Sequence, residues 1–409
     1  MMIALVRRAA FFAFVLLLAA VAVGGIQPKN PPDTSLATFP LAYYGANWDR
    51  TAVDLELLSR LQIVILMQED GNCWKKCCPN SGIVGPDQCG AILTPNNDSS
   101  LYPGCDPACD QLGTQMNTFE RLQALAKTDG RRPPHCIMYL NSIYLWPFDH
   151  SEAMGDDVKV LDVHGLPHAE NCDPGIFPSY FWGWDRAPGR DAWLITINRT
   201  IVDGPADGAY VDCWEEIPFV CNAANTSCIA KRNGSWKSIN ENVTHATVEA
   251  YTNGKLSGLE TAAAWVTGIG GTWFGSVGQN LVMLQVSPPA SFIPVVQRAL
   301  MHVNYVIASC HGSPWNNPQR TEDLNVPIQC EDIKGQLDTT CLASFLLAVE
   351  PGLFLLCGGL LQGKEQLPLG NATAPATRSK TGVWTRSFPS GTSVIFEEST
   401  GKGNVTWAQ

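Results

Sequence analysis

The sequence predicts a (β/α)8 barrel, and two observations carry that prediction. Short apolar runs typical of buried strands alternate along the chain with stretches of helical periodicity. Eight such runs occur between residues 39 and 357. Repeated strand-then-helix units indicate a parallel sheet, and eight of them predict a closed barrel.

Each predicted strand is almost free of charge and ends beside turn residues. The eight strands are expected over residues 39–45, 61–67, 136–141, 208–212, 272–277, 281–286, 303–308 and 352–357. The helices are expected over residues 52–60, 118–126, 191–201, 244–266, 292–301 and 339–349. The connection at 278–280 is too short for a crossover helix, so one of the two strands that it joins is open to misassignment.

The two ends of the chain differ in character from the barrel. Arg7 and Arg8 precede an apolar run over 9–23 and the small residues Gly24 and Gly25, which is the layout of a secretory signal peptide. We therefore expect a signal peptide over 1–25, with an uncleaved membrane anchor as the alternative. The barrel should span 36–370, and residues 382–409 should form a β appendage packed on it.

Cysteines and glycosylation sequons agree with export. The chain has 15 cysteines, all after the leader. Asn-x-Ser/Thr sequons occur at Asn97, Asn198, Asn225, Asn233, Asn242, Asn371 and Asn404. Six cysteines crowd the region 73–109 after the second strand, where we expect disulfides rather than a structural zinc. The remaining nine are odd in number, so at least one thiol should stay unpaired, and Cys136 and Cys357, inside apolar strands, are candidates for buried inert thiols.

The charge and motif content excludes several functions. The net charge is −11 and the pI is near 5.1, which argues against nucleic-acid and anionic-membrane partners. After signal cleavage we expect no membrane association. The histidines lack metal-ligand spacing, and no phosphate-binding loop or dinucleotide fingerprint occurs, so we expect no metal and no cofactor. The oligomeric state stays open.

Three stretches resemble a known family of barrels. They are FPLAYYG at 39–45, DGAYVD at Asp207–Asp212, and FLLAVEPG at 345–352 with the tail segments that follow it. On these stretches the chain resembles the secreted glycosyl-hydrolase-like (β/α)8 proteins of algae and related microbes. These are similar to polygalactosaminidase-type barrels of glycoside hydrolase family 114 and its relatives. The resemblance implies a catalytic carboxylate at Asp212, although this strand is one residue shorter than the family pattern.

The residues themselves also point to Asp212. Active sites of such barrels lie at the carboxyl ends of the strands, and Asp212 ends the fourth strand. Glycoside hydrolysis usually needs two carboxylates, one as proton donor and one as nucleophile or base. The candidate partners are Glu215, Glu216, Glu69 and Asp70. Asp212 could instead cap a helix, and the other four could belong to solvated loops.

The last arc of the barrel contains no acidic residue. Between Glu260 and Glu322 the sequence has neither Asp nor Glu. Both acids must therefore come from strands two to four and their loops, or the protein is not a hydrolase.

Aromatic and amide side chains are expected around the same rim. The candidate sugar-binding residues are Tyr43, Trp48, Asn141, Trp146, Trp214, Trp273 and Trp315, with Tyr44, Trp182 and Trp184 also considered. Aromatic faces stack on the apolar C–H faces of sugars, but packing explains many of them equally well. Asn141 could equally cap a turn.

The sequence thus predicts a secreted glycoside hydrolase that acts on a poly- or oligosaccharide by carboxylate acid/base chemistry. The alternatives are a catalytically inactive glycan-binding barrel and an extracellular scaffold without a sugar site. Localisation should be extracellular, or at the cell surface and in the secretory pathway if the leader stays as an anchor.

Overall fold

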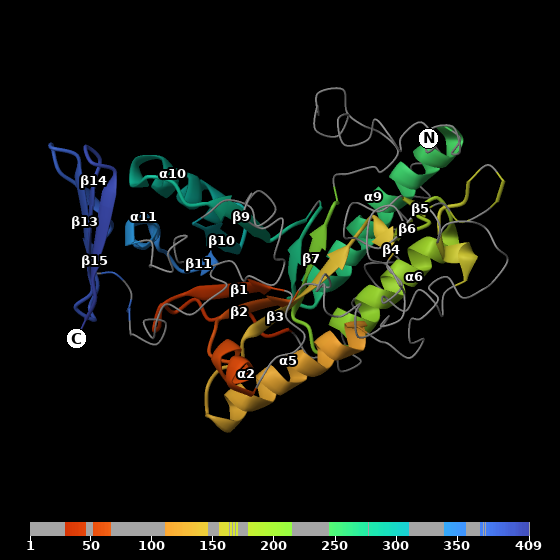
Figure 1. Cartoon of the computed structure of the whole chain (residues 1–409), viewed down its shortest axis with the longest axis horizontal. Helices are drawn as coiled ribbons and strands as arrows, with labels where there is room; N and C mark the ends of the chain where they lie inside the picture. The colour runs from red at the N-terminus through yellow and green to blue at the C-terminus, as the bar shows by residue number, and fades with distance from the viewer. Residues whose placement is uncertain are drawn as a thin grey trace, which may run out of the picture.

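The computed structural model describes residues 29–45, 52–66, 111–145, 155–162, 164–165, 167, 169–170, 179–214, 245–276, 278–310, 339–356, 369–370, 372 and 374–408. Its centre is an eight-stranded parallel sheet (Figure 1). The strands are β1 (Leu41–Gly45), β2 (Ile63–Leu66), β3 (His135–Asn141), β7 (Gly208–Asp212), β8 (Thr272–Phe274), β9 (Leu281–Gln285), β10 (Tyr305–Ser309) and β11 (Leu353–Leu356). All eight predicted strands are present, so the predicted (β/α)8 fold class is confirmed.

The two faces of each strand enter two separate apolar clusters. One cluster contains only strand residues, among them Tyr44, Tyr139, Tyr210 and Phe354, and therefore fills the barrel interior. The other joins the opposite strand faces to helix residues such as Phe119. Side chains alternate along a strand, so both faces must be apolar when both are covered. That is why the strand sequences are nearly continuous apolar runs.

The sheet is nearly closed, with a seam between β8 and β9. The strand order is β8-β7-β3-β2-β1-β11-β10-β9, so these two strands form the edges. Asn280 bridges them: its Oδ1 accepts from Trp273 N at 2.7 Å, and its Nδ2 donates to Gly271 O at 3.0 Å. Its carbonyl accepts from Tyr305 N at 3.0 Å. Both strands flanking the short connection at 278–280 are therefore present. The hydrogen bonds of Asn280 hold them together without a crossover helix.

Six helices cover the described part of the barrel. They are α2 (Ala52–Leu58), α5 (Gln111–Thr128), α6 (Ala187–Ile197), α9 (His245–Gly268), α10 (Pro289–Leu300) and α11 (Thr339–Ala348). Helix α6 begins four residues before its predicted start because a proline lies in its first turn, where the missing N–H costs nothing. It runs on into a π-helical turn, η3 (Asn198–Val202). Within the described ranges, no helix has both the length and the apolar character to cross a membrane.

Between β3 and α6, where the sequence predicts neither strand nor helix, the described residues form a small sheet of their own. A three-stranded antiparallel sheet forms from β4 (Tyr144–Leu145), β5 (Ala169–Glu170) and β6 (Ser179–Phe181). A short 3-10 turn, η2 (Asp156–Val158), lies between β4 and β5.

The tail forms a four-stranded antiparallel sheet at one end of the molecule (Figure 1). Its strands are β12 (Thr377–Arg378), β13 (Val383–Ser387), β14 (Ser393–Glu397) and β15 (Lys402–Thr406). One face packs on α11, all of whose residues from Cys341 to Ala348 are buried. Arg386 of β13 donates to Leu347 O at 3.0 Å and Val349 O at 2.7 Å, which satisfies carbonyls at the end of α11.

Candidate active site

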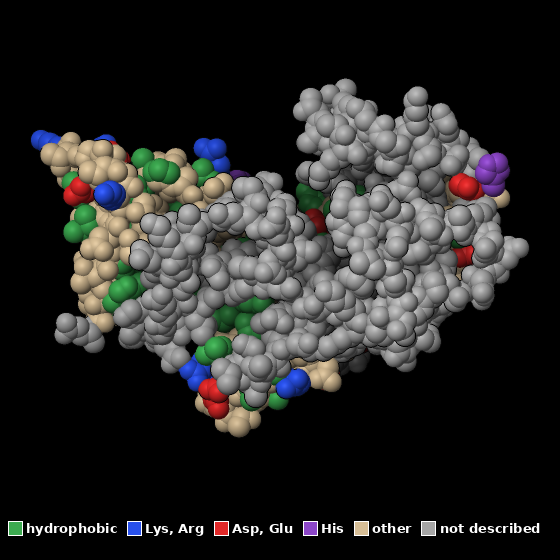
Figure 2. Space-filling model, viewed as in Figure 1, with side chains coloured by type: hydrophobic (Ala, Val, Ile, Leu, Met, Phe, Trp, Pro, Cys, Tyr) green, Lys and Arg blue, Asp and Glu red, His purple; other side chains and the backbone are tan. Residues whose placement is uncertain are grey.

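Asp212 and Asn141 lie side by side where two neighbouring strands end. The register pairs them directly, at the carboxyl ends of β7 and β3. Both share the strand face of Tyr210 and Tyr139, which belong to the interior cluster. Asp212 is half-buried at the carboxyl end of its strand. In Figure 2, hydrophobic and acidic atoms are visible within a hollow near the middle of the molecule, and the described Lys and Arg side chains are scattered in small groups.

Both carboxylate oxygens of Asp212 accept hydrogen bonds. Tyr139 Oη donates to Oδ2 at 2.5 Å, and the Cys213 backbone N–H donates to Oδ1 at 2.8 Å. Hydrogen bonds to an ionised acceptor are short and strong. In this geometry the group is an oriented hydrogen-bond acceptor, which is the form that a nucleophile, a base or a stabiliser of positive charge requires.

A tight turn after β7 fixes the direction of this carboxylate. Cys213 adopts a left-handed conformation with φ of 56°, which a non-glycine residue rarely takes. Its carbonyl accepts from Lys255 Nζ at 2.6 Å, and the Lys255 side chain is buried in α9. The Asp212 carbonyl accepts from Ser142 N at 3.1 Å and from Ser142 Oγ at 2.8 Å. The surrounding structure therefore holds the strained turn in place.

Beneath Asp212 the barrel interior is aromatic. Tyr210 stacks between Tyr139 and Phe274, with ring centroids 5.6 and 4.5 Å apart, and Tyr44 meets Tyr210 edge-on at 5.5 Å. Burial raises the pKa of Tyr210, and the nearby charge of Asp212 raises it further. This floor was not predicted from the sequence. Tyr139 and Tyr210 lie two residues before the ends of their strands, Tyr44 lies one residue before the end of β1, and Phe274 ends β8.

Several predicted sugar-binding residues are placed elsewhere. Tyr43 is 5% exposed and faces the helix layer. Side chains alternate along β1, and the residues on either side of Tyr43 are the ones that point into the barrel interior. Trp273 is fully buried in the same layer and donates to Ser276 Oγ at 2.9 Å. Trp182 and Trp184 are also buried. These residues pack the fold, so the expectation that they line a rim is corrected.

Asn141 serves as a cap in this structure. Its Oδ1 accepts from Ile143 N and Tyr144 N, both at 2.8 Å, which shapes the turn after β3. Its Nδ2 faces the Cys213 sulfur at 3.8 Å. Trp214 follows the turn and is half-buried. The other predicted site residues lie outside the described residues: Glu69, Asp70, Glu215, Glu216, Trp48, Trp146 and Trp315.

The remaining described strand ends carry no acid. Strands β8 to β11 end in Phe274, Gln285, Ser309 and Leu356. A different acidic residue, Asp185, was missed by the sequence analysis. It lies between β6 and α6, directly after Trp184, whose indole N–H donates to Ser142 O at 2.7 Å in the turn after β3. Burial raises the pKa of Asp185, although Arg186 opposes this, and a raised pKa suits a proton donor.

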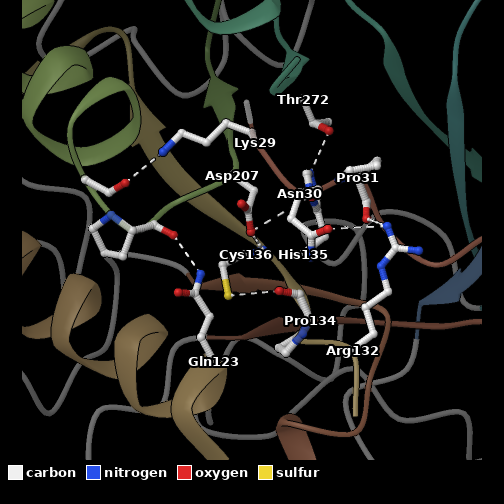
Figure 3. Close-up of polar contacts among 12 residues, drawn as sticks. Lys29, Asn30, Pro31, Gln123, Arg132, Pro134, His135, Cys136, Asp207 and Thr272 are labelled. Carbon is white, nitrogen blue, oxygen red and sulfur yellow. Dashed lines mark hydrogen bonds and ion pairs between the residues drawn. The ribbon is translucent and has the colours of Figure 1, made fainter. Parts of the chain in front are cut away.

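A second polar cluster lies at the opposite end of the barrel (Figure 3). His135 Nδ1 donates to Asn30 O at 2.6 Å, and Nε2 accepts from Thr272 Oγ1 at 2.7 Å. The tautomer is assigned in this way because a carbonyl oxygen can only accept, so Nδ1 carries the proton. Asp207 Oδ2 accepts from Cys136 N at 2.9 Å and lies 3.9 Å from His135 Nδ1. His135, Asp207 and Thr272 lie at the starts of their strands, the end of the barrel opposite to the one where active sites of such barrels lie.

Burial governs the titration of this second cluster. It lowers the pKa of His135, raises that of Asp207 and raises that of the Cys136 thiol, which is fully buried as expected. Among the described residues, no group of His, Cys, Asp and Glu is arranged to hold a metal ion.

Solved structures with some likeness to this chain include glycoside-cleaving enzymes. A GH31 family sulfoquinovosidase from E. rectale has a TM-score of 0.35 and 15% identity, over 72% of this chain and 41% of that one. A GH36 alpha-galactosidase from Geobacillus stearothermophilus has a TM-score of 0.36 and 9% identity, over 90% and 48%. An alpha-N-acetylgalactosaminidase from Bifidobacterium bifidum has a TM-score of 0.36 and 12% identity, over 91% and 58%.

This chain spans about half the length of each of those structures. No protein-family model and no curated protein matches it. Likeness at this level carries no argument about activity, so function has to be argued from the site itself.

Proposed function

We propose that this chain is an exported glycoside hydrolase that acts on a poly- or oligosaccharide, with Asp212 as a catalytic carboxylate. One observation carries the proposal: Asp212 ends β7 on the interior side of the barrel, above an aromatic floor, with both oxygens oriented by hydrogen bonds. The predicted leader, the sequons and the resemblance to polygalactosaminidase-type barrels favour export and a sugar substrate.

Asp212 would act as nucleophile or base, because its oxygens already accept two hydrogen bonds. The proton donor would come from Asp185, whose pKa is raised by burial, or from Glu215, Glu216, Glu69 or Asp70. A carboxyl separation of about 5–5.5 Å would give retention of the anomeric configuration, and about 6.5–9.5 Å would give inversion.

A polysaccharide panel with reducing-end detection tests this proposal. The wild type should release reducing ends from at least one glycan, and Asp212→Asn should bind that glycan but cleave it about 10²–10⁴-fold more slowly. If Asp185 is the donor, Asp185→Asn should remove the alkaline limb of the pH profile, because that limb reports deprotonation of the general acid. Cleavage that is unchanged in Asp212→Asn would remove that residue from the mechanism.

The second candidate function is glycan binding without cleavage. It is favoured by the described ends of β8 to β11, which bring no carboxylate to the rim. In that case the wild type binds a glycan but releases no reducing ends, and Phe274→Ala weakens binding while Asp212→Asn does not.

A further inference from the structure

A groove lies on the outside of the helix layer, where α6 and η3 meet α9. Its volume is about 550 Å³, and its apolar wall is formed by Leu194, Ile195 and Trp265. Ile195 is 60% exposed, and Trp265 is only partly buried. Apolar side chains that share one groove form a contiguous surface, and contiguous apolar surface is a common mark of a contact site.

The same groove is lined by an N-glycosylation sequon. Asn198, Arg199 and Thr200 form one of two sequons among the described residues, and Asn198 and Arg199 both line the groove. The other sequon begins at Asn404, which is exposed on the edge strand β15. A ligand attached to Asn198 would therefore start inside the groove.

We propose that Asn198 carries an N-linked glycan whose first N-acetylglucosamine units pack in this groove against Trp265. The donor is a polyprenyl-diphosphate-linked oligosaccharide. Asn198 Nδ2 forms a bond to the anomeric carbon, the bond from that carbon to the diphosphate oxygen breaks, and Nδ2 loses one proton. The proposal depends on export of the chain and is independent of catalysis at Asp212.

The chemistry of the groove matches that of a sugar. Aromatic and aliphatic surface accepts the C–H face of the pyranose ring, as other apolar surface does. Asp191, Arg199 and Asp203 line the same groove and can hydrogen-bond the ring hydroxyls and the acetamide. Asn198 Nδ2 donates to Asp203 Oδ2 at 2.5 Å, and a glycosylated amide keeps one N–H for that bond.

The geometry also fixes when the glycan is added. Thr200 is fully buried, and its Oγ1 donates to Thr196 O at 2.8 Å within the helix. The sequon hydroxyl is therefore inaccessible in the folded protein. Transfer must precede the folding of α6, and the groove closes around a glycan that is already attached.

The full chain secreted from a eukaryotic host provides the test. Glycopeptide mass spectrometry measures the occupancy of Asn198, and thermal unfolding is recorded before trimming, after trimming to one N-acetylglucosamine, and after complete deglycosylation. Asn198 should be occupied. Complete removal should lower Tm by roughly 1–3 °C, while trimming to one sugar should keep most of that stability.

Two sets of variants separate the groove from a general glycan effect. In Trp265→Ala the Tm loss on deglycosylation should disappear, and in Trp265→Tyr it should persist. Ile195→Ser changes an exposed residue in the apolar wall of the groove and should reduce the Tm loss on deglycosylation. This variant keeps the test decisive even if Trp265→Ala folds poorly. Asn404→Gln removes the sequon on the edge strand β15 and should leave the Tm loss on deglycosylation unchanged. An unoccupied Asn198 in the secreted chain, or equal losses in wild type, Trp265→Ala and Ile195→Ser, would overturn the proposal.

Discussion

Tyr139→Phe isolates the hydrogen bond that orients Asp212. The Tyr139 Oη–H···Oδ2 distance is 2.5 Å, and phenylalanine keeps the buried ring stacked on Tyr210. A hydrogen bond to a charged group contributes about 1.5–3 kcal/mol. Because Asp212 is half-buried and water can partly replace the hydroxyl, we expect a loss of about 1–2 kcal/mol in the free energy of unfolding.

Urea denaturation of four proteins measures this coupling at pH 7: wild type, Tyr139→Phe, Asp212→Asn and the double variant. The coupling energy should be about 1 kcal/mol or more, since both side chains share one bond. Tyr210→Phe is the matched control, because within the described residues its hydroxyl makes no hydrogen bond while its ring stacks in the same floor. Additive effects of Tyr139→Phe and Asp212→Asn would refute the reasoning.

Three further predictions concern the supports of the fold. Arg386→Met should lower the free energy of unfolding by roughly 2–4 kcal/mol in urea, because buried carbonyls at the end of α11 lose a charged donor, whereas Arg378→Met on an exposed pair should change little. Burial lowers the pKa of His135 below its usual 6.5 in the folded protein. As the pH falls, His135 therefore binds a proton in the unfolded chain before it does so in the folded protein. The free energy of unfolding should then drop from about pH 6.5 downward. His135→Gln should flatten that slope between pH 7.5 and 5.5, and an unchanged slope would contradict the assignment. Cys341→Ser should lower unfolding free energy by about 4 kcal/mol in the chain-entropy model, since the Cys310–Cys341 disulfide spans 31 positions; an unchanged urea midpoint would exclude this.

The barrel was predictable from the sequence because its strands are buried on both faces. Such strands become continuous apolar runs, as in LQIVILM around β2, and turn residues mark their ends. The seam at Asn280 was not predictable. A side-chain amide that bridges two edge strands leaves no periodic signal, and the short connection argued against the strands that it joins.

The candidate site was predictable only in its carboxylate. Asp212 ends an apolar strand, and that pattern predicts a rim position. Tyr43 and Trp273 were assigned to the rim because the residue type suits sugars, but alternation along the strand turns both toward the helices. Counting alternate positions back from Asp212 would have found Tyr210 instead.

Chemical rescue of Asp212→Gly tests the central claim most directly. The variant removes the carboxylate and leaves space at the mouth of the barrel. On a glycan that the wild type cleaves, kcat should fall by about 10²–10⁴-fold, and added formate or azide should restore part of it because a small anion can occupy the vacated position. Full activity in Asp212→Gly without any added anion would contradict the assignment of Asp212 as the catalytic carboxylate.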